Sequence, residues 1–594
     1  MLLPKQSRNC VTGLAAACSL LLIACSPEEV RQVNLIPKPE QMTMTGGTFT
    51  VDSLALFGGQ SSRNIKTVID EAWSGNPEGY QLDVTPGGID LRAGSPDGLF
   101  YGMQTLRQLY AGGEVPCVSI RDNPRFGYRG LHLDVSRHFF SKEEVMKLLD
   151  VMSFYKLNTL HMHLTDAGGW RIEIDKYPKL TSETAFRTES DWRKWWDGRD
   201  RKYLPEGTPG AYGGYYTKEL SCSGKPYRNG DFCIGNEQSF TFMEDVLAEV
   251  IDLFPSEYIH VGGDEAGKSA WKKCPKCQAL MKEKGMKNVD ELQSYMIHRA
   301  EEFLNSKDRK LIGWDEILEG GLAPEATVMS WRGEDGGIKS ARMGHDVVMT
   351  PGNYMYLDFY QADPKTQPYA IGGYTPIKKV YSYDPVPADS LTAEECRHIL
   401  GVQANTWTEY IQTPEHLEYM MFPRALAVAE IGWTPQELRT WEDFKPRMNA
   451  HISKLQGMGI RTFTLSDELE VTMQVDTAGR KIEVILDAEK YPAEIRYTTD
   501  GSVPVASSAL YAGPITVQDS AHIKAAIFRD GVLQGTRTEK KVDYHRAINK
   551  PIHYNSKLYE GYMAGGTNAL LDGYRGGLTY LDGRWQGYLD DLDC

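Results

Sequence analysis

The chain has 594 residues, which is too long for one ordinary hydrophobic core, so we expect several domains. Its content of 41% hydrophobic and 24% charged residues is typical of a soluble globular protein. The 80 acidic residues outnumber the 65 basic ones and give a net charge of −15. This balance argues against nucleic acid as a partner, because nucleic-acid binders usually carry a basic face.

The first 24 residues have the features of an export signal. Lys5 and Arg8 precede an apolar run that ends at Ala24 and is shorter than the ~20 residues of a membrane-spanning helix. Leu22-Ile23-Ala24-Cys25 resembles a bacterial lipobox, in which the cysteine is acylated. We therefore expect a lipoprotein signal peptide over 1–24, a lipid on Cys25, and an exported protein at the outer membrane, in the periplasm or at the cell surface. The alternative is an ordinary signal peptide with a chance cysteine.

Residues 31–123 are expected to form a small α+β domain. Short strand-like runs surround one helical pattern, in which Leu99, Met103, Leu106 and Leu109 recur at helical spacing and give one apolar face. Asp122-Asn123-Pro124 then marks a boundary.

Residues 124–467 alternate strand-like and helical segments, the pattern of a parallel α/β fold. Strands are expected at about 128–135, 158–165, 258–262, 310–315, 327–332, 346–350 and 401–407. Helices are expected at 142–156, 239–253, 290–306, 335–343, 415–430 and 441–457.

Several expected strands end in carboxylate or tryptophan residues. These endings are Asp166, Asp264, Trp314-Asp315, Trp331-Arg332 and Trp407-Thr408-Glu409. A TIM barrel builds its active site at the carboxyl ends of its strands, so the pattern favours a TIM-type (β/α)8 barrel. The alternative is that these residues only begin loops.

The C-terminal part changes to β structure. Residues 468–545 contain the alternating run Lys481–Leu486 and a turn at Thr499–Ser502, which predict a small β-sandwich. Residues 546–594, with Asp582–Gly587, resemble the start of a discoidin-like carbohydrate-binding module that stops at Cys594.

The cysteines do not predict a metal site. Cys274-Pro275-Lys276-Cys277 has the spacing of half a zinc site, but no second pair follows nearby. A local disulfide or an unpaired structural pair is favoured in an exported protein. Cys222 and Cys233 are a further pair, and sequence does not fix the connectivity.

The central motif is His260-Val261-Gly262-Gly263-Asp264-Glu265, which follows a strand-like segment. Two adjacent carboxylates repel each other, so they are costly as structure. They are useful when one serves as a general acid while its neighbour stays ionised. Alone, such a pair is more often a solvated loop feature.

Four further groups of segments accompany this motif in a fixed order. They are Phe126–Gly130 leading into Leu133–His138, Asn158–Asp166 with Gly169–Arg171, Gly313–Glu316 with Ser330–Arg332, and Tyr356–Asp358 with Gln403–Glu409. Together they resemble glycoside hydrolase family 20, the β-N-acetylhexosaminidases. The resemblance implies a multidomain α/β protein with an N-terminal α+β companion domain, a catalytic TIM-type barrel and a C-terminal β-sandwich.

The resemblance also implies a role for each matching residue. Glu265 would be the general acid and then the base, and Asp264 would orient the substrate acetamido group and balance its charge. The acetamido oxygen would be the nucleophile, as in the substrate-assisted families that depart from the two-carboxylate scheme. Tyr356 would hold that oxygen, and no metal or organic cofactor is implied. The residues expected to bind the sugar are Arg129, Trp314, Trp331, Asp358, Trp407 and Glu409.

Each of these roles has a structural alternative. Arg129 could be a strand-end ion-pair partner, and the tryptophans could belong to the core. Supporting positions at the barrel mouth are expected for Asp134, Asp166, His163 and His260, while His161 and His163 are expected to be structural rather than metal ligands.

Two features depart from the family pattern. Asp166-Ala167-Gly168 stands where the family has Asp-Asp-Gln. No Pro-Gly-His motif exists in the chain, and the stretch from Asp166 to Gln238 contains no convincing strand run. We therefore expect seven barrel strands, one βα unit (the third) being absent, with an open seam between the second and fourth strands.

The sequence thus predicts a retaining exo-β-N-acetylhexosaminidase that acts on glycans or oligosaccharides and reaches the membrane only through its lipid anchor. Two alternatives stay open. One is a relative that releases a disaccharide, like a lacto-N-biosidase, and the other is a catalytically impaired carbohydrate-binding lipoprotein.

Overall fold

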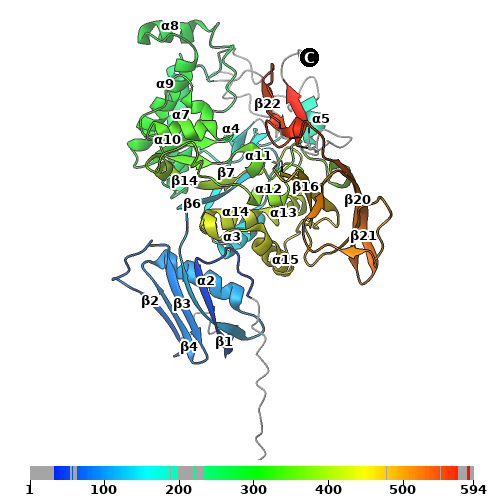
Figure 1. The fold of residues 1–594 in the computed structure, drawn as a ribbon. Coiled ribbons are helices and arrows are strands. Elements are labelled where there is room, and N and C mark those ends of the chain that lie inside the picture. Colours follow the sequence, from blue (N-terminus) through cyan, green and yellow to red (C-terminus); the bar gives the residue numbers. More distant parts are fainter. Residues whose placement is uncertain are drawn as a thin grey trace, which may run out of the picture.

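The computed structural model describes residues 33–53, 57, 63–166, 168–182, 184–187, 189–197, 220–222, 232–476, 478–548, 550–572 and 585–588. Figure 1 shows an N-terminal domain below a larger α/β domain, with a β-sandwich on one side. The expected lipidation site, Cys25, lies outside the described residues, as does part of the stretch between Asp166 and Gln238. Among the described helices, none has both the length and the apolar character needed to cross a membrane.

The N-terminal domain is one five-stranded sheet with a helix packed on it. The sheet has the order β1-β5-β3-β4-β2, and α2 (Pro96–Leu109) begins at Ser95, whose hydroxyl accepts the N–H groups of Asp97 and Gly98. The strands are β1 (Gln41–Thr50), β2 (Ile65–Ile69), β3 (Tyr80–Thr85), β4 (Gly88–Ala93) and β5 (Glu114–Asp122). The expected helix over this region is therefore confirmed.

Asp122 joins this domain to the α/β domain through two buried polar contacts. Lys156 Nζ lies 2.9 Å from Asp122 Oδ2, and the Trp433 indole nitrogen donates to Asp122 Oδ1 at 2.9 Å. The Lys156 side chain is 1% exposed and that of Asp122 is fully buried. Asp122 thus pairs with two donors of the neighbouring domain.

The α/β domain is built on a curled, fully parallel sheet. Its order is β10-β11-β12-β13-β14-β6-β7, so the first strand in the chain pairs with the last. The strands are β6 (Tyr128–Asp134), β7 (Thr159–His163), β10 (Tyr258–His260), β11 (Lys310–Trp314), β12 (Thr327–Ser330), β13 (Val347–Met349) and β14 (Ile399–Ala404). This is the expected TIM-barrel arrangement, and the described part of the chain contributes seven strands to it.

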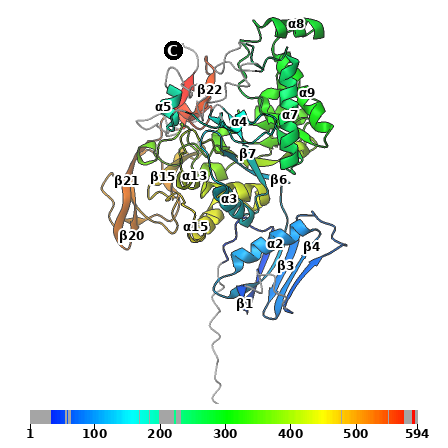
Figure 2. The same ribbon diagram turned by 180° about the vertical axis from the view of Figure 1, so that it is seen from behind.

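Helices cover the outside of this sheet. Figure 1 and Figure 2 both place α7, α8 and α9 on one side of the molecule and the β-sandwich on the other. The longer helices are α3 (Lys142–Phe154), α7 (Glu237–Leu253), α8 (Pro275–Lys284), α9 (Asp290–Asn305), α10 (Asp335–Arg342), α13 (Pro414–Met421), α14 (Arg424–Trp433) and α15 (Trp441–Gly457). The shorter ones include α4 (Lys179–Ser182), α5 (Trp192–Asp197), α11 (Gly352–Met355) and α12 (Ile377–Tyr381).

One helix expected from sequence is wrong in detail. The segment 415–430 forms two helices, α13 and α14, which are separated at Phe422-Pro423. Proline has no N–H to donate to the preceding turn, so α13 ends before it. The helix α8, which follows the Asp264-Glu265 motif, was not expected.

The two outer strands of the curled sheet, β7 and β10, do not pair with each other among the described residues. A cavity of about 1180 Å³ extends along both strands. Apolar side chains of these strands and of α7 line it, namely Leu160, Met162, Phe242, Leu247, Val250 and Ile259. These side chains are of the kind that an additional βα unit would cover.

The C-terminal region contains two facing antiparallel sheets with a common core. One has the order β15-β16-β19 and the other β18-β17-β20-β21. The strands are β15 (Leu469–Asp476), β16 (Lys481–Ala488), β17 (Glu494–Thr498), β18 (Ala509–Leu510), β19 (Ile515–Val517), β20 (Ser520–Arg529) and β21 (Val532–Asp543). Beyond them, β22 (Leu558–Met563) pairs with β23 (Gln586–Tyr588). The relation of residues 546–594 to a discoidin-like module stays a prediction.

Candidate active site at the strand ends

Most of the site residues expected from sequence lie at one end of the curled sheet. Asp134 and His163 end β6 and β7, and Trp314 ends β11. Asp264 and Glu265 follow β10, Trp331 follows β12, and Tyr356 and Asp358 follow β13 after the short α11. Trp407 and Glu409 follow β14. The carboxyl ends of parallel strands meet at one edge, so these side chains converge.

Glycines shape the turn that presents the adjacent carboxylates. Gly262 and Gly263 have φ angles of 75° and 105°, in the left-handed region that glycine adopts without strain. A Cβ on Gly263 would lie 2.6 Å from Ile317 Cγ2, so any larger residue would collide there. Glu265 itself has a φ of 48°, a conformation that non-glycine residues adopt at a cost and that recurs at functional sites.

The two carboxylates occupy a concave part of the surface. Both side chains are exposed and line the end of the large cavity. The surrounding protein still desolvates Asp264 and raises its pKa, and the nearby charges of Asp166 and Glu265 act in the same direction. A second cavity of about 300 Å³ lies beside Glu265, Trp331 and Arg332, so Glu265 borders both cavities.

An aromatic wall stands beside the carboxylates. Trp331 stacks on Tyr356 with ring centroids 6.2 Å apart and an angle of 17° between the ring planes. Tyr356 lies 6.4 Å from Trp407, which lies 5.8 Å from Trp314. Burial raises the pKa of Tyr356 well above its usual value, with a smaller contribution from Asp358, so its hydroxyl stays protonated as a donor.

Trp331 is fixed by a neighbouring carboxylate. Its indole nitrogen donates to Glu316 Oε2 at 2.9 Å. Burial raises the pKa of Glu316 to about 7, although the hydrogen bond from Trp331 acts in the opposite direction. The orientation of the ring therefore depends on a carboxyl group that titrates near neutral pH.

Arg137 is a cation that contacts several carboxylates of this mouth, and sequence reasoning did not assign it a role. Its guanidinium lies 3.0 Å from Asp134 Oδ2, 2.9 Å from Asp166 Oδ2 and 3.5 Å from Glu409 Oε1. It also lies 5.0 Å from the ring of Trp407. Its position three residues after Asp134, just beyond a strand end, was the available signal.

The remaining sugar-binding candidates, Asp358 and Glu409, form an acidic pair. Burial raises the pKa of both, and for Asp358 the nearby Glu409 adds to the effect. Arg137 is the main group that lowers the pKa of Glu409. The Trp407 backbone N–H donates to Asp358 Oδ1 at 3.5 Å, which connects the acidic pair to the aromatic wall.

Arg129 does not lie in this mouth, and its expected role in sugar binding is wrong. The residue is near the amino end of β6, at the opposite end of the sheet. Its fully buried guanidinium lies 2.8 and 3.0 Å from the two carboxylate oxygens of Glu78 in the N-terminal domain. It is the ion-pair partner that the alternative interpretation described.

Four histidines lie together in the sheet interior below the mouth, namely the buried His132 and the half-buried His161, His163 and His260. His163 Nε2 lies 2.9 Å from Asp166 Oδ2, and the Gly262 N–H donates to His260 Nδ1 at 3.0 Å. Burial lowers the pKa of His161 to about 3 and that of His132 and His260 well below the usual value, so these rings are neutral. His132, which sequence reasoning missed, lies 4.4 Å from the ring of Trp407 and supports it from below.

The cysteines differ from the sequence expectation. All six described cysteines are free thiols, so of the two expectations for Cys274 and Cys277, a local disulfide or an unpaired structural pair, the disulfide is not formed. Instead, Cys222, Cys233, Cys274 and Cys277 come together in one cluster. The clustered cysteines are 41 to 55 residues apart where the two pairs meet, which is why spacing alone did not reveal the group.

Comparison with protein families gives matches to all three parts of the molecule. Residues 126–223 and 221–436 match the model described as the catalytic domain of glycosyl hydrolase family 20, and 53–123 match domain 2 of that family. Residues 475–539 match the chitobiase/beta-hexosaminidase C-terminal domain. The two catalytic segments meet at 221–223, between β7 and β10.

Comparison with individual proteins agrees. A beta-hexosaminidase of Porphyromonas gingivalis is 38% identical over 592 residues, covering 86% of this chain and 76% of that protein. A beta-hexosaminidase of Akkermansia muciniphila is 32% identical, covering 73% of this chain and 92% of that protein. The GH20 exo beta-N-acetylglucosaminidase of Vibrio harveyi, solved with N-acetylglucosamine, superposes with a TM-score of 0.61 at 28% identity, covering 73% of this chain and 78% of that one.

Proposed function

Because the chain belongs to glycosyl hydrolase family 20, we propose that it removes terminal, non-reducing β-linked N-acetylhexosamine from glycans with retention of configuration. The family membership establishes a glycoside hydrolase of the β-N-acetylhexosaminidase class. The finer part of the proposal is the mechanism, in which the substrate's own acetamido oxygen is the nucleophile. Family 20 is among the exceptions to the scheme of two protein carboxylates.

Glu265 is the general acid and base in this mechanism. It lies on the strained turn after β10 and borders both cavities, so it reaches a glycosidic oxygen that lies between a sugar and the group attached to it. It protonates the leaving oxygen and later deprotonates the incoming water. General acid–base help of this kind contributes ~10²–10⁴-fold to the rate.

Asp264 and Tyr356 act on the acetamido group. The carboxylate of Asp264 accepts the acetamido N–H and balances the positive charge that develops as the oxygen attacks the anomeric carbon. The buried, protonated hydroxyl of Tyr356 donates to the acetamido oxygen and fixes its direction. The two groups are close enough for the charge of Asp264 to raise the pKa of Tyr356, which supports their action on one substrate group.

The sugar is held by the aromatic wall and the charged residues. Trp314, Trp331 and Trp407 enclose the ring and the acetyl methyl group. Asp358 and Glu409 accept hydrogen bonds from sugar hydroxyls, and charge-assisted bonds of this type are about twice as strong as neutral ones. Arg137 takes the place that sequence reasoning gave to Arg129, because it holds Glu409 from within the same mouth.

The observation that carries the proposal is the adjacency of Asp264 and Glu265 beyond the end of β10, where they line cavities together with Trp314 and Trp331. A mouth with a second carboxylate placed for direct attack would favour a covalent glycosyl-enzyme instead. The substrate-assisted mechanism and the covalent mechanism therefore predict different effects of Asp264→Asn and Glu265→Gln on activity.

Paired substitutions test this proposal. Glu265→Gln and Asp264→Asn are compared with Asp252→Asn, an exposed position on α7, using a chromogenic N-acetylglucosaminide. Glu265→Gln is expected to lose ~10²–10⁴-fold in kcat/KM. Asp264→Asn is expected to lose activity together with its preference for a thiazoline mimic of the cyclic intermediate, since a transition-state-like mimic binds far more tightly than product. Near-full activity of Asp264→Asn, or equal affinity of the wild type for thiazoline and N-acetylglucosamine, would falsify the mechanism.

We also propose that the chain lacks the third βα unit of its family's barrel. The unpaired outer strands β7 and β10, the cavity along them and the division of the family match at 221–223 support this. Lower activity and stability than an intact relative are expected. Export through the signal at 1–24 and anchoring at Cys25 stay proposals, tested by radiolabelled palmitate incorporation in the wild type and in Cys25→Ala.

A further inference from the structure

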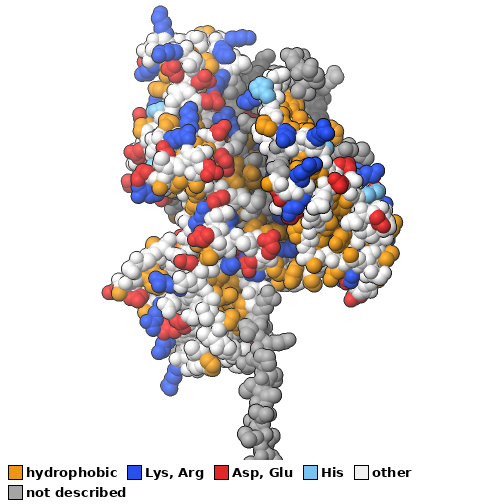
Figure 3. All heavy atoms as spheres, viewed as in Figure 1, with side chains coloured by type: hydrophobic (Ala, Val, Ile, Leu, Met, Phe, Trp, Pro, Cys, Tyr) orange, Lys and Arg blue, Asp and Glu red, His pale blue; other side chains and the backbone are white. Residues whose placement is uncertain are grey.

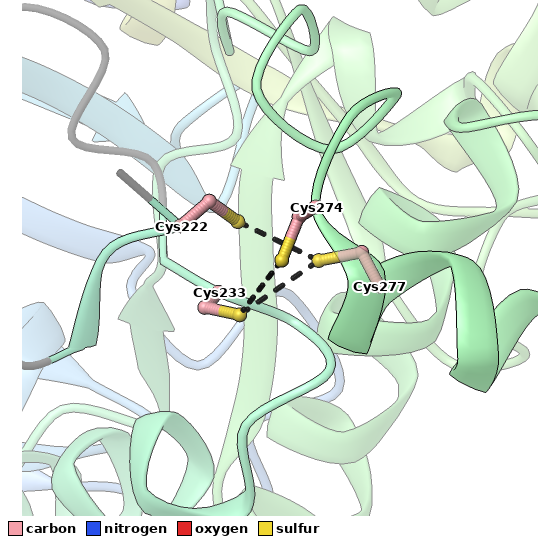
Figure 4. A group of neighbouring side chains, drawn as sticks. All are labelled: Cys222, Cys233, Cys274 and Cys277. Carbon is pink, nitrogen blue, oxygen red and sulfur yellow. Dashed lines mark hydrogen bonds between the residues drawn. The ribbon is translucent and has the colours of Figure 1, made fainter. Parts of the chain in front are cut away.

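We propose that Cys222, Cys233, Cys274 and Cys277 form a tetrathiolate site that binds one Zn²⁺ ion and anchors the chain next to the catalytic turn. Figure 4 shows the four sulfur atoms facing one another. The Sγ atoms of Cys222 and Cys277 are 3.5 Å apart, those of Cys233 and Cys274 are 3.6 Å apart, and those of Cys233 and Cys277 are 3.9 Å apart. All four lie within 4.8 Å of one another.

These separations fit a shared metal ion. Zinc–sulfur bonds of ~2.3 Å in a tetrahedron place the sulfur atoms ~3.8 Å apart, which is inside the observed range. Four thiolates in a tetrahedron are the ligand set of structural zinc, which has no open position for substrate. The proposed ion is therefore structural and takes no part in glycoside hydrolysis.

The four ligands come from two segments of the chain. The first arm carries Cys274 and Cys277 at the beginning of α8, and the second arm carries Cys222 and Cys233 before α7. Cys274 is the residue before the first turn of α8, with Pro275 at the first helical position, and its side chain makes no capping hydrogen bond. Figure 4 shows the thiols of Cys274 and Cys277 pointing toward those of Cys222 and Cys233.

In the second arm, the residues next to Cys222 are hydrogen-bonded to those next to Cys233. The Cys233 N–H donates to the Leu220 carbonyl at 2.7 Å, and Ser221 forms a bridge with Phe232. Gly235 allows the two arms to touch, since a Cβ there would lie 2.2 Å from the carbonyl carbon of Lys276. Both arms are therefore built for close contact.

The surroundings favour a bound ion over four isolated thiols. Cys233, Cys274 and Cys277 are 3%, 7% and 0% exposed, and they lie among Phe240, Trp271 and Leu292. The other described cysteines, the buried Cys117 and the half-buried Cys396, do not belong to the cluster.

Positive charge near the cluster also favours a bound ion. Zn²⁺ with four thiolates carries a net charge of −2, and Lys272, Lys273 and Lys276 are exposed residues of the same arm. Lysines beside the cluster stabilise that charge.

The position of the cluster indicates that the ion links two segments next to the catalytic turn. Cys274 follows Glu265 by nine residues, and Trp271 and Phe232 line the large cavity beside β10. The second arm leads directly into α7, which packs on α9. The ion thus fastens the segment before α7 to the segment after the catalytic turn, on the side of the sheet where β7 and β10 are the outer strands of the described part.

Metal content of the full chain tests the site. The protein is expressed, purified without chelator, and analysed by inductively coupled plasma mass spectrometry. One zinc per chain is expected in the wild type and in Cys396→Ser, and a reduction of at least ~10-fold is expected in Cys277→Ser because ligand loss opens the tetrahedron. Titration of the wild type with an organomercurial should release the zinc as the four thiols react.

The wild type alone decides the outcome if Cys277→Ser does not fold. Replacement of the ion by Co²⁺ is expected to give the intense visible bands of tetrahedral cobalt bound by thiolates. Substoichiometric zinc with four reactive thiols would overturn the proposal, as would one iron per chain, or two disulfides shown by a mass four hydrogens lower. These readouts do not use glycosidase activity, so the site and the proposed mechanism can fail separately.

Discussion

Replacement of Arg137 by methionine tests the assignment of the cation in the active-site mouth. The substitution leaves the carboxylates of Asp134, Asp166 and Glu409 without the guanidinium that lies 3.0, 2.9 and 3.5 Å from them. A hydrogen bond to a charged group contributes ~1.5–3 kcal/mol, which corresponds to ~10–150-fold in kcat/KM when it is lost from the transition state. We expect a loss of ~10²-fold at neutral pH.

The pH profile of kcat/KM distinguishes the loss of the contacts between Arg137 and the carboxylates from a general disruption of the fold. Arg137 is the main group that opposes the raised pKa of Glu409, so its removal raises that pKa further. The acid limb of kcat/KM should move to higher pH, and the variant should recover part of its activity as the pH rises. Arg137→Lys keeps the charge but not the planar fork and should be intermediate.

The assay needs a control for folding. Removal of one partner from a buried ion pair costs ~3–5 kcal/mol, so kcat/KM is normalised to active sites titrated with a tight-binding thiazoline. Arg299→Lys, at a surface pair with Glu237 and Glu244, should stay within ~2-fold of the wild type. If Arg137→Met keeps kcat/KM within ~3-fold at every pH, the reasoning from its contacts is refuted.

Three further outcomes follow from the structure. Arg129→Met should lower the free energy of unfolding by ~3–5 kcal/mol in denaturant titration because Glu78 loses its partner, while kcat/KM per folded molecule stays near wild type; a selective loss of kcat/KM would return Arg129 to the sugar site. Glu316 has a folded-state pKa raised to about 7, so the folded protein holds its proton more tightly and stability falls as the pH rises from ordinary carboxyl values to about 7. Glu316→Gln should remove up to ~3 kcal/mol of that pH dependence, and an unchanged slope between pH 5 and pH 8 would contradict the shift. In hydrogen exchange, amides of the outer strands β7 and β10 should exchange faster than those of the inner β12 and β13, and equal protection would indicate that the outer edges are covered.

The sequence predicted the strand ends well because burial and chemistry act on neighbouring residues. Apolar runs that stop at Trp314, Trp331 and Trp407 indicate both a buried strand and the point at which it reaches the surface. The same local logic places Asp264 and Glu265 beyond β10. Parallel pairing then brings these ends together without any further information from the sequence.

The two arginines show where local reasoning fails. Arg129 lies at the beginning of β6 and Arg137 lies just beyond its end, and both belong to segments that resemble the family. Which end of a strand faces the site is settled by the direction of the strand, and Arg129 comes at its beginning. The carboxylate that pairs with it, Glu78, is 51 residues away in another domain, which no local pattern shows.

The divided helix and the cysteine cluster show the same contrast between local signals and contacts that are distant in the sequence. Pro423 is a local signal for the end of α13 and could have been used. Cys222 and Cys233 approach Cys274 and Cys277 only because the chain folds back across 41 to 55 residues. The spacing within the pair Cys222 and Cys233, or within the pair Cys274 and Cys277, does not indicate that the two pairs meet.

The buried contacts between the N-terminal domain and the barrel limit how the gene can be divided. Arg129 and Lys156 belong to the barrel, while their carboxylate partners, Glu78 and Asp122, belong to the domain before it. Expression of the barrel alone would remove the counter-ions of both cations and expose the surface on which they lie, so we expect the fragment to be less stable than the whole chain. A chimaera with the corresponding domain of a relative should therefore keep carboxylates at the positions equivalent to 78 and 122.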